Sequence, residues 1–145
     1  KKQLVGAAII AALLSLTACN TIPDPQQQQS IALLQKNTWE LRQIGNTDID
    51  LSNKGNIPNL RFDPSNQNIF GTDGCNRLSG IYQVKEQQIL IQNIASTRMI
   101  CPDNMQQVDQ FNQALSKVTS YQVYDATLRL LDRYGNVALL FHAAK

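Results

Sequence analysis

The segment TLRLLDRYGNVALLFH, residues 127–142, decides the fold class. Two apolar runs, Thr127 to Leu131 and Val137 to His142, flank the polar segment 132–136. Gly135 and Asn136 in that segment tolerate the positive φ that a tight hairpin requires. The segment therefore predicts two antiparallel strands joined by a hairpin.

Upstream of this hairpin, apolar residues again recur mostly with a period of two, and turn residues separate the runs, as in antiparallel strands. The expected strands are marked by Trp39, Leu41 and Ile44; by Leu60 and Phe62, closed by Asp63-Pro64; by Asn68 to Gly71; by Ile81, Tyr82 and Val84; by Ile89 to Ile91, running towards Met99; and by Tyr121 to Tyr124.

One segment follows a different period. After Pro102, apolar residues recur at spacings of three and four, which predicts an amphipathic helix, with Asp103 as N-cap and Gln106 three residues later. The apolar stripe of this helix should pack on the sheet; the alternative is that it lines a ligand site. The stripe consists of Met105, Val108, Phe111, Leu115 and Val118.

Residues 37–145 are enough for one domain. We expect the α+β class: a small antiparallel, partly open β-barrel-like sheet with one packed α-helix.

The N-terminal segment resembles a bacterial export signal. Lys1 and Lys2 precede an apolar run from Leu4 to Leu16, and small residues lead to Cys19. This order predicts a lipoprotein signal peptide over residues 1–18 and a lipid-modified Cys19. One alternative is a retained transmembrane helix, but a span needs roughly 17 to 25 apolar residues. The other is an ordinary secretory signal in which the cysteine is incidental.

Asn20, rather than an aspartate, follows the cysteine. By resemblance to sorting in enteric-type bacteria, this favours the outer membrane, with the protein facing the periplasm. Residues 19–36 are expected to form a flexible, Gln-rich tether containing Pro23 and Pro25. Within it, residues 30–36 could form a turn or two of helix.

Removal of Lys1 and Lys2 reduces the 13 basic residues to 11, which balance the 11 acidic ones. A nucleic-acid-binding protein would show a basic stripe, and a polybasic membrane patch would show clustered Lys and Arg. We therefore expect no nucleic-acid partner and attachment to the membrane only through the N-terminal lipid.

Once Cys19 is acylated, Cys75 and Cys101 remain as an even pair. In an oxidising compartment the default for such a pair is a disulfide; the alternative is two buried thiols.

Catalytic patterns are weak. His142 is the only histidine, and it falls on an expected strand. No G-x-S-x-G elbow and no spaced set of zinc ligands occurs. Asp48, Asp50 and Asp63 lie among turn residues, so a Ca²⁺ site is a minor alternative there. We expect no catalytic residue, no cofactor and no metal.

Three motifs resemble the META domain family, which includes the heat-inducible bacterial lipoprotein HslJ. They are Thr38 to Leu41; Gly71 to Asn76, running on to Gly80-Ile81-Tyr82; and Ser96 to Cys101. The resemblance implies a barrel-like sheet with one helix, an envelope setting, and links to heat shock, stress and novobiocin resistance. It implies no catalytic residue. The motif positions expected to be structural are Trp39, Gly71, Gly74, Asn76, Gly80, Thr97 and Met99.

The motif residues also have physical interpretations. The glycines are expected at tight turns or at close backbone approaches, and Asn76 is expected to be a buried hydrogen-bonding residue. Arg77 and Arg98 could bind an anion, but a solvated surface role is favoured.

We therefore expect a membrane-anchored, non-catalytic binding or stress-accessory module with an envelope protein as its partner. One alternative is a carrier that holds a lipid or small hydrophobic ligand between the sheet and the face bearing Met105 and Phe111. The other is a purely structural envelope protein.

Overall fold

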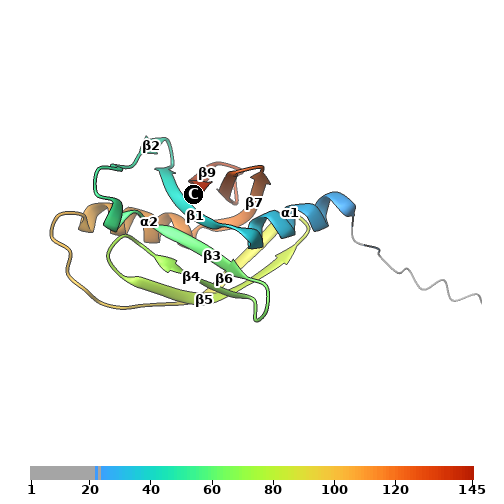
Figure 1. Cartoon of the computed structure of the whole chain (residues 1–145), viewed down its shortest axis with the longest axis horizontal. Helices are drawn as coiled ribbons and strands as arrows, with labels where there is room; N and C mark the ends of the chain where they lie inside the picture. Colours follow the sequence, from blue (N-terminus) through green and yellow to red (C-terminus); the bar gives the residue numbers. More distant parts are fainter. Residues whose placement is uncertain (1–21, 23) are drawn as a thin grey trace, which may run out of the picture.

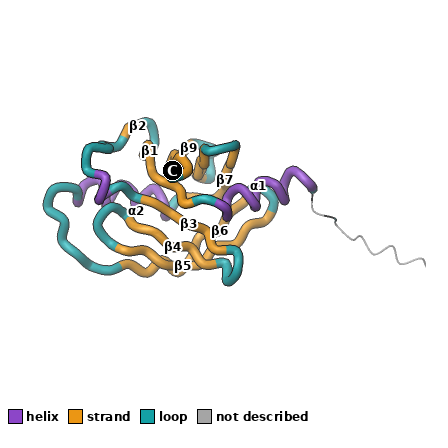
Figure 2. The backbone as a smooth tube through the Cα atoms, in the orientation of Figure 1, coloured by secondary structure: helices purple, strands orange, loops and turns teal. Residues whose placement is uncertain are grey.

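A single antiparallel sheet of nine strands dominates the computed structural model, which describes Ile22 and residues 24–145 (Figures 1 and 2). The predicted signal peptide and Cys19 lie outside the described residues. The elements are α1 (Pro25–Lys36), β1 (Thr38–Ile44), β2 (Thr47–Asp48), the 3₁₀ turn η1 (Lys54–Asn56), β3 (Asn59–Asp63), β4 (Asn68–Thr72), β5 (Arg77–Lys85), β6 (Gln88–Ser96), α2 (Met105–Ser116), β7 (Val118–Tyr124), β8 (Thr127–Asp132) and β9 (Val137–Ala143).

Pairing of the first long strand with the last closes the sheet into a barrel. Strands β3 to β9 follow one another in sequence order, and β1 pairs with both β3 and β9. In the closing ladder, Trp39 lies opposite Ala143 and Leu41 lies opposite Phe141. The short strand β2 is added outside the ring, on β1. The predicted α+β class and the barrel-like antiparallel sheet are confirmed.

The ladder between β6 and β7 is the shortest of those that form the ring, followed by the three pairs of β1 with β3. Gln88 and Ser120 form its one register pair, whereas β6 and β5 share seven. Helix α2 lies in the connection between these two strands. The openness expected of the sheet is therefore confined to the β6–β7 joint.

Side chains that alternate along the strands fill the barrel. Two edge-to-face aromatic pairs contribute to the interior: Phe62 with Tyr82 at 5.1 Å between ring centroids, and Phe111 with Phe141 at 6.5 Å. Such pairs add about 0.5–1.5 kcal/mol each beyond the burial of their area. The other large side chains with almost no exposure are Trp39, Leu34, Leu41, Leu60, Ile69, Ile89, Leu128 and Leu130.

Helix α1 corrects two expectations: that residues 25–36 belong to a flexible tether, and that the folded domain begins at residue 37. Residues 19–21 and 23 of the predicted tether, which covered residues 19–36, lie outside the described residues. Asp24 caps the helix by accepting a hydrogen bond from the Gln26 amide, and Pro25 occupies the first turn. At the other end Leu34 is completely buried, and its carbonyl accepts a 2.9 Å hydrogen bond from Trp39 Nε1. The described residues therefore hold a second helix, which is part of the folded unit.

Tyr82 and Tyr121 lie beneath α1. Gln35 Nε2 donates to the Tyr82 hydroxyl at 2.8 Å, and this hydroxyl donates to the Asp63 carbonyl at 3.2 Å. The Tyr121 hydroxyl is buried without a hydrogen-bond partner in the described structure. Burial raises the pKa of both phenols above the ordinary value of 10.0.

Helix α2 differs from its prediction at both ends. Its N-cap is Asn104 rather than Asp103, without a capping hydrogen bond from the side chain. Val118, expected on the helical stripe, is the first residue of β7. Between these ends Val108, Phe111 and Leu115 are buried as expected, and Met105 is half-buried. Phe111 packs on Phe141 of β9, so this part of the stripe packs on the sheet as expected.

We predict that Leu34→Ala lowers the free energy of unfolding by about 2–5 kcal/mol, the usual cost of emptying a buried leucine site. Urea unfolding followed by the fluorescence of Trp39 measures this loss. Leu51→Ala is the matched control: Leu51 is 43% exposed, so its loss should stay within about 0.5 kcal/mol. Equal effects of the two substitutions would show that α1 is not part of the folded unit.

We predict that stability falls as the pH rises above about 10. A tyrosine whose folded pKa is raised binds more protons in the folded state than in the unfolded state, so ionisation favours unfolding. Unfolding midpoints measured from pH 8 to pH 11 should decline at the alkaline end. The decline should be smaller in Tyr121→Phe, because Phe at this position has no proton to lose. An identical alkaline decline in that variant would contradict the assignment.

Candidate functional site

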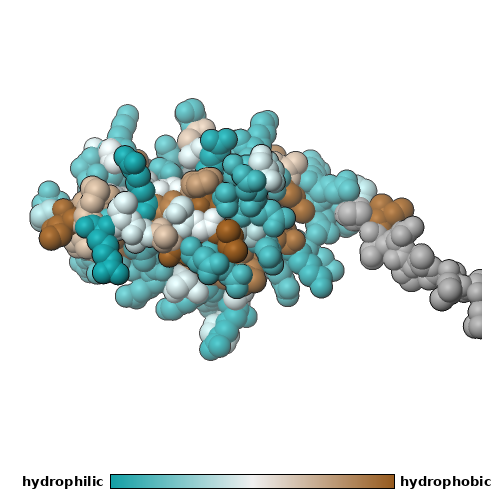
Figure 3. Space-filling model, turned by 90° about the horizontal axis from the view of Figure 1, so that it is seen from below, coloured by the Kyte–Doolittle hydropathy of each residue, from teal (hydrophilic) through white to brown (hydrophobic). Residues whose placement is uncertain are grey.

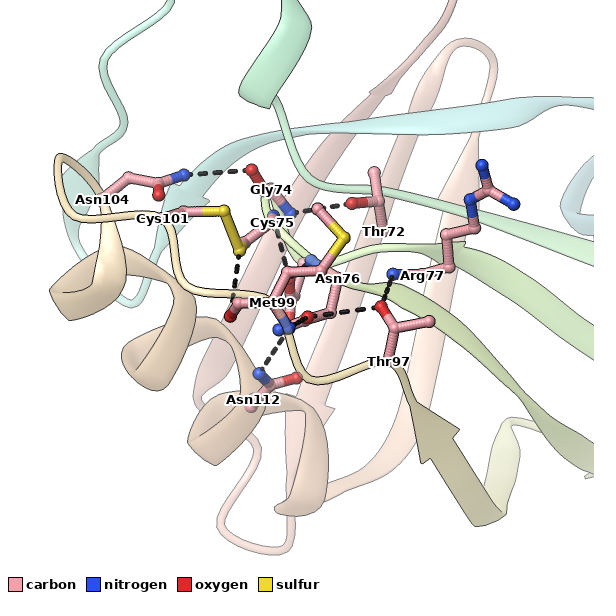
Figure 4. The surroundings of a disulfide bond; sticks show 11 residues. Thr72, Gly74, Cys75, Asn76, Arg77, Thr97, Met99, Cys101, Asn104 and Asn112 are labelled. Atoms are coloured by element: carbon pink, nitrogen blue, oxygen red, sulfur yellow. Dashed lines mark hydrogen bonds between the residues drawn. A yellow bond between two sulfur atoms is a disulfide. The ribbon is translucent and has the colours of Figure 1, made fainter.

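Two of the three family-like motifs, Gly71 to Asn76 and Ser96 to Cys101, meet at one end of the barrel, where a disulfide joins two loops (Figure 4). Cys75 in the β4–β5 loop is bonded to Cys101, which follows β6, with 5.9 Å between their Cα atoms. We refer to residues 72–77, residues 97–101 and Asn104 and Asn112 as the junction. Its components come from a hairpin loop, from the segment before α2 and from α2 with its cap.

Asp73 is the centre of the junction. Its side chain is completely buried, and Oδ1 accepts hydrogen bonds from the amides of Cys75 at 3.0 Å and Asn76 at 2.6 Å. Oδ2 accepts from Nδ2 of Asn112, on α2, at 2.9 Å. These three donors compensate for the loss of water around a buried carboxylate. Asp73 therefore folds its own loop and connects that loop to α2.

Asn76 connects the loop to the segment after β6. Its side-chain oxygen accepts from the Met99 amide at 2.6 Å and from the Thr97 hydroxyl at 3.2 Å. The same hydroxyl accepts from the Arg77 amide at 3.1 Å. Figure 4 shows these groups converging beneath the disulfide. Asn76 thus has the buried hydrogen-bonding role expected of it.

Gly71 and Gly74 meet two different backbone requirements. A Cβ on Gly71 would lie 1.9 Å from the Asn59 carbonyl oxygen, so β3 and β4 approach too closely for any side chain. Gly74 has φ of +97°, a conformation that side-chain-bearing residues rarely adopt. Its carbonyl also accepts from Asn104 Nδ2 at 3.0 Å. These contacts bring the loop to the N-cap of α2.

The junction holds two apolar side chains in solvent. Met99 is 55% exposed and Ile100 is 86% exposed, although the residues around them are fixed by the disulfide and by Asn76. Ordering a segment costs roughly 1–2 kcal/mol per residue, and here the covalent bond and the buried polar network offset that cost. Two exposed apolar side chains therefore lie on a backbone that the disulfide and Asn76 hold in place.

The other residues considered in the sequence lie apart from any reactive cluster. His142 is exposed on β9. Arg77 and Arg98 are exposed, and within the described residues neither forms an ion pair. Within the same part of the chain, no group of three His, Cys, Asp or Glu side chains is placed to hold a metal ion.

Asp48 and Asp50 are exposed near η1. They line a hollow of about 560 Å³ that also includes Asp103 on the α2 side. Asp63, the third aspartate considered for Ca²⁺, caps a turn by accepting from the Ser65 amide. Asp63 is not among the residues that line this hollow, so the structure does not place the three aspartates at one site. Among the helices of residues 22 and 24–145, none is sufficiently long and apolar to span a membrane.

Sequence reasoning missed three members of the junction: Asp73, Asn104 and Asn112. Gly74 was expected at a tight turn or a close backbone approach, but nothing local shows that the carboxylate of the preceding Asp73 is buried. Asn112 occupies a polar position of an amphipathic helix, where a solvent-facing role is the default. An available clue was the spacing of Asn112 from Val108 and Leu115, which places it beside the buried stripe.

Solved structures share this fold at low sequence identity. A protein from Burkholderia xenovorans studied by NMR has a TM-score of 0.65 and 21% identity, covering 100% of this chain and 99% of that one. A second NMR structure has a TM-score of 0.60 and 19% identity, covering 75% and 90%. A crystal structure of a DUF4847 family protein from Bacteroides vulgatus has a TM-score of 0.54 and 16% identity, covering 78% and 96%. These likenesses show the fold alone.

The sequence itself matches the model of the META domain over residues 32–145. The match begins inside α1, which agrees with the inclusion of this helix in the folded unit. No curated protein matches the chain closely enough to establish a relationship.

We predict that Asn76→Ala lowers the free energy of unfolding by about 1–3 kcal/mol, because the Met99 amide loses its acceptor. Amide hydrogen exchange should accelerate at Met99 in particular. The matched control is Asn66→Ala, in the exposed β3–β4 turn, which should leave both quantities unchanged. Unaltered exchange at Met99 in Asn76→Ala would show that Asn76 does not hold the loop.

Proposed function

This chain belongs to the META domain family, and from that premise we propose that it is an envelope lipoprotein that acts by contact with another envelope component. In this proposal Cys19 carries the lipid, the outer membrane is the anchoring surface, and the barrel faces the periplasm. The module is non-catalytic and supports stress and antibiotic tolerance, as an HslJ-like protein would.

Two features support the envelope setting. The segment Leu16-Thr17-Ala18-Cys19 has the order of a lipoprotein cleavage site behind an apolar run. The Cys75–Cys101 disulfide is the cysteine state that persists in oxidising compartments such as the bacterial periplasm. The two features are independent, since one concerns the N-terminus and the other the interior of the domain.

The observation that carries the contact function is the exposed pair Met99 and Ile100 on a loop that is otherwise held rigid. A preorganised surface loses little conformational entropy on binding, so more of its contact energy becomes affinity. The two central polar side chains of the junction are already engaged within it: Asp73 has three donors and Asn76 has two. Within the described structure, the buried Oδ1 of Asn104 has no hydrogen-bond partner. The role of Asp73 and Asn76 is to fix the loop, and the exposed apolar side chains are available for contact.

We predict that Cys19→Ala moves the full chain from the membrane fraction to the soluble periplasmic fraction. Stable attachment takes more than one acyl chain, and an unmodified N-terminus carries none. Intact mass spectrometry should show the acyl mass on the wild-type chain and its absence in the variant. Continued membrane attachment of the unacylated variant would contradict a lipid anchor.

We predict that Ile100→Asp reduces in-cell crosslinking of the lipidated chain to its partner and leaves the unfolding midpoint unchanged, because Ile100 is 86% exposed. Tyr124→Asp is the matched control, since Tyr124 is 81% exposed and lies on β7, away from the junction. Mass spectrometry identifies the crosslinked proteins. A reproducible partner that is lost equally in both variants, or that persists in both, would show that this loop is not the contact surface.

A further inference from the structure

Strand β6 has a free edge over most of its length. It pairs with β5 from Gln88 to Ser96, but its only register pair with β7 is Gln88 with Ser120. Beyond that pair β7 has not yet begun, because α2 and its flanking loops occupy the intervening sequence. Among the residues that the structure describes, the side of β6 that faces away from β5 therefore has no strand partner from about Leu90 to Ser96.

The second half of β6 buries neither of its faces in the barrel interior. Every residue from Gln92 to Ile100 is exposed, whereas in the neighbouring part of β5 buried and exposed residues alternate. A barrel strand normally buries one of its two faces. Asn93 has φ of +55°, and the β5–β6 register shifts between Ser79 and Ile81, which marks a bulge. Bulges bend the strand that carries them.

Hydrogen bonds at the two ends of β6 show which of its backbone groups point toward the free edge. The Tyr121 amide donates to the Gln87 carbonyl, so the backbone groups of Gln87 point toward β7. Because the backbone groups of successive strand residues point to opposite sides, those of Ile91 point the same way as those of Gln87. After the bulge, Thr97 donates to the Arg77 carbonyl, so Thr97 faces β5 and Ser96 faces away from it. Ile91 and Ser96 thus present backbone N–H and C=O groups to an incoming strand.

This edge lacks the usual protection. Natural edge strands are blunted by charges, proline or very short length. The sequence QILIQNIAS of β6 has nine residues, no charge and no proline. The bulge at Asn93 is the one protective device present, and it leaves the edge exposed rather than covered. Such an edge is suited to strand addition by a peptide.

We propose that the free edge of β6 is where an extended peptide from another envelope protein adds as a further strand, and that this peptide carries an acidic residue near Arg98. The inference rests on the proposed contact function and names its surface and the chemistry of its partner. The incoming strand would satisfy the free backbone groups of Ile91 and Ser96. Its apolar side chains would contact Leu90, Ile94 and the loop residues Met99 and Ile100.

The charges of this region favour an acidic partner. No Asp or Glu occurs between Gln87 and Pro102, and Arg98 is the charged residue in that stretch. Arg77, whose backbone pairs with Thr97, is also exposed, and among the described residues neither arginine has an ion-pair partner. A second copy of β6 would bring no carboxylate to these arginines, so a different protein fits this edge better.

The outer surface beside the edge is hollowed. A depression of about 460 Å³ lies across β4, β5 and the end of β6, lined by residues that include Phe70, Arg77, Ala95 and Thr97. Phe70 is 43% exposed there. Figure 3 shows this side of the molecule as largely hydrophilic, with apolar atoms at the end where the loop before α2 lies. A side chain of the added strand can enter the depression.

The test uses the full lipidated chain in the cells that produce it. A photoreactive benzoylphenylalanine replaces Gln92 on the free edge. Separate chains carry the same group at Ile100, in the exposed loop, and at Arg129, exposed on β8, as the control position. Irradiation should give one adduct from position 92, and mass spectrometry should place the crosslink in a segment with alternating apolar residues and an Asp or Glu. Position 129 should not give that adduct.

Two substitutions test the mode of binding. Ser96→Pro removes an edge N–H and leaves the β5 ladder intact, so the adduct should fall roughly five-fold, the effect of one lost hydrogen bond. Ser96→Ala, which keeps the N–H, should leave the adduct unchanged. Arg98→Glu should also reduce the adduct, by like-charge repulsion, and it carries the test if Ser96→Pro lowers the unfolding midpoint or loses the disulfide.

The outcomes separate this inference from the proposed function. An adduct that is insensitive to both Ser96→Pro and Arg98→Glu overturns strand addition. An adduct to a differently tagged copy of this chain shows that β6 pairs with itself and also overturns it. An adduct from position 129 or 100 but none from position 92 overturns the assignment of the free edge of β6 as the binding surface. It is still consistent with the proposed contact function. No adduct from any of the three positions contradicts both.

Discussion

The indole of Trp39 is the contact on which the rest of the fold depends. Its ring is completely buried, and its N–H donates to the Leu34 carbonyl at the end of α1. Its backbone lies in β1, where Leu60 of β3 is on one side and Ala143 of β9 is on the other. One residue thus joins the helix, the two ladders of the closing strand and the barrel interior, so its position constrains all of them together.

At the junction the structure is held by two kinds of bond that reinforce each other. The disulfide restricts how far the β4–β5 loop and the segment before α2 can separate. The buried side chains of Asp73 and Asn76 determine which of the remaining arrangements is adopted, because each carries several hydrogen bonds with fixed directions. Buried polar side chains whose hydrogen bonds are satisfied, as those of Asp73 and Asn76 are, favour a single conformation. The exposed residues Met99 and Ile100 lie on backbone that these hydrogen bonds hold in place.

Most of the sheet follows from local sequence. Strands with one buried face alternate apolar and polar residues, so Thr127 to His142 and the runs around Trp39 and Phe62 are recognisable without tertiary information. The first half of α1 was missed, and its second half was expected only as a possible turn or two of helix, because the apolar content is low and four glutamines suggested a tether. The Asp24-Pro25 pair was the available signal, since an Asp N-cap followed by proline is typical of a helix start.

Other errors had tertiary causes. Val118 lies at a helical spacing from Leu115, yet it begins β7 because its backbone pairs with Asp132. Periodicity cannot distinguish the last turn of a helix from the first residue of a following strand. The same limit applies to the candidate site: the motif residues were identifiable, but the burial of Asp73 and the partnership with Asn112 depend on how α2 packs against the barrel. The free edge of β6 was likewise invisible, because a run such as QILIQNIAS has the same appearance whether its edge is paired or not.

Closure of the ring by β1 and β9 has a consequence for the order of folding. The two strands are separated by nearly the whole domain, so the ladder between Trp39 and Ala143 forms only after the C-terminal strand has been synthesised. Until then one side of β1 is unpaired and the interior around Trp39 lacks part of its cover. Hairpins such as β4–β5 and β5–β6 join neighbouring segments and form early, whereas the long-range ladder must wait. The chain is therefore most exposed to misfolding between the formation of β1 and the pairing of β9 with it.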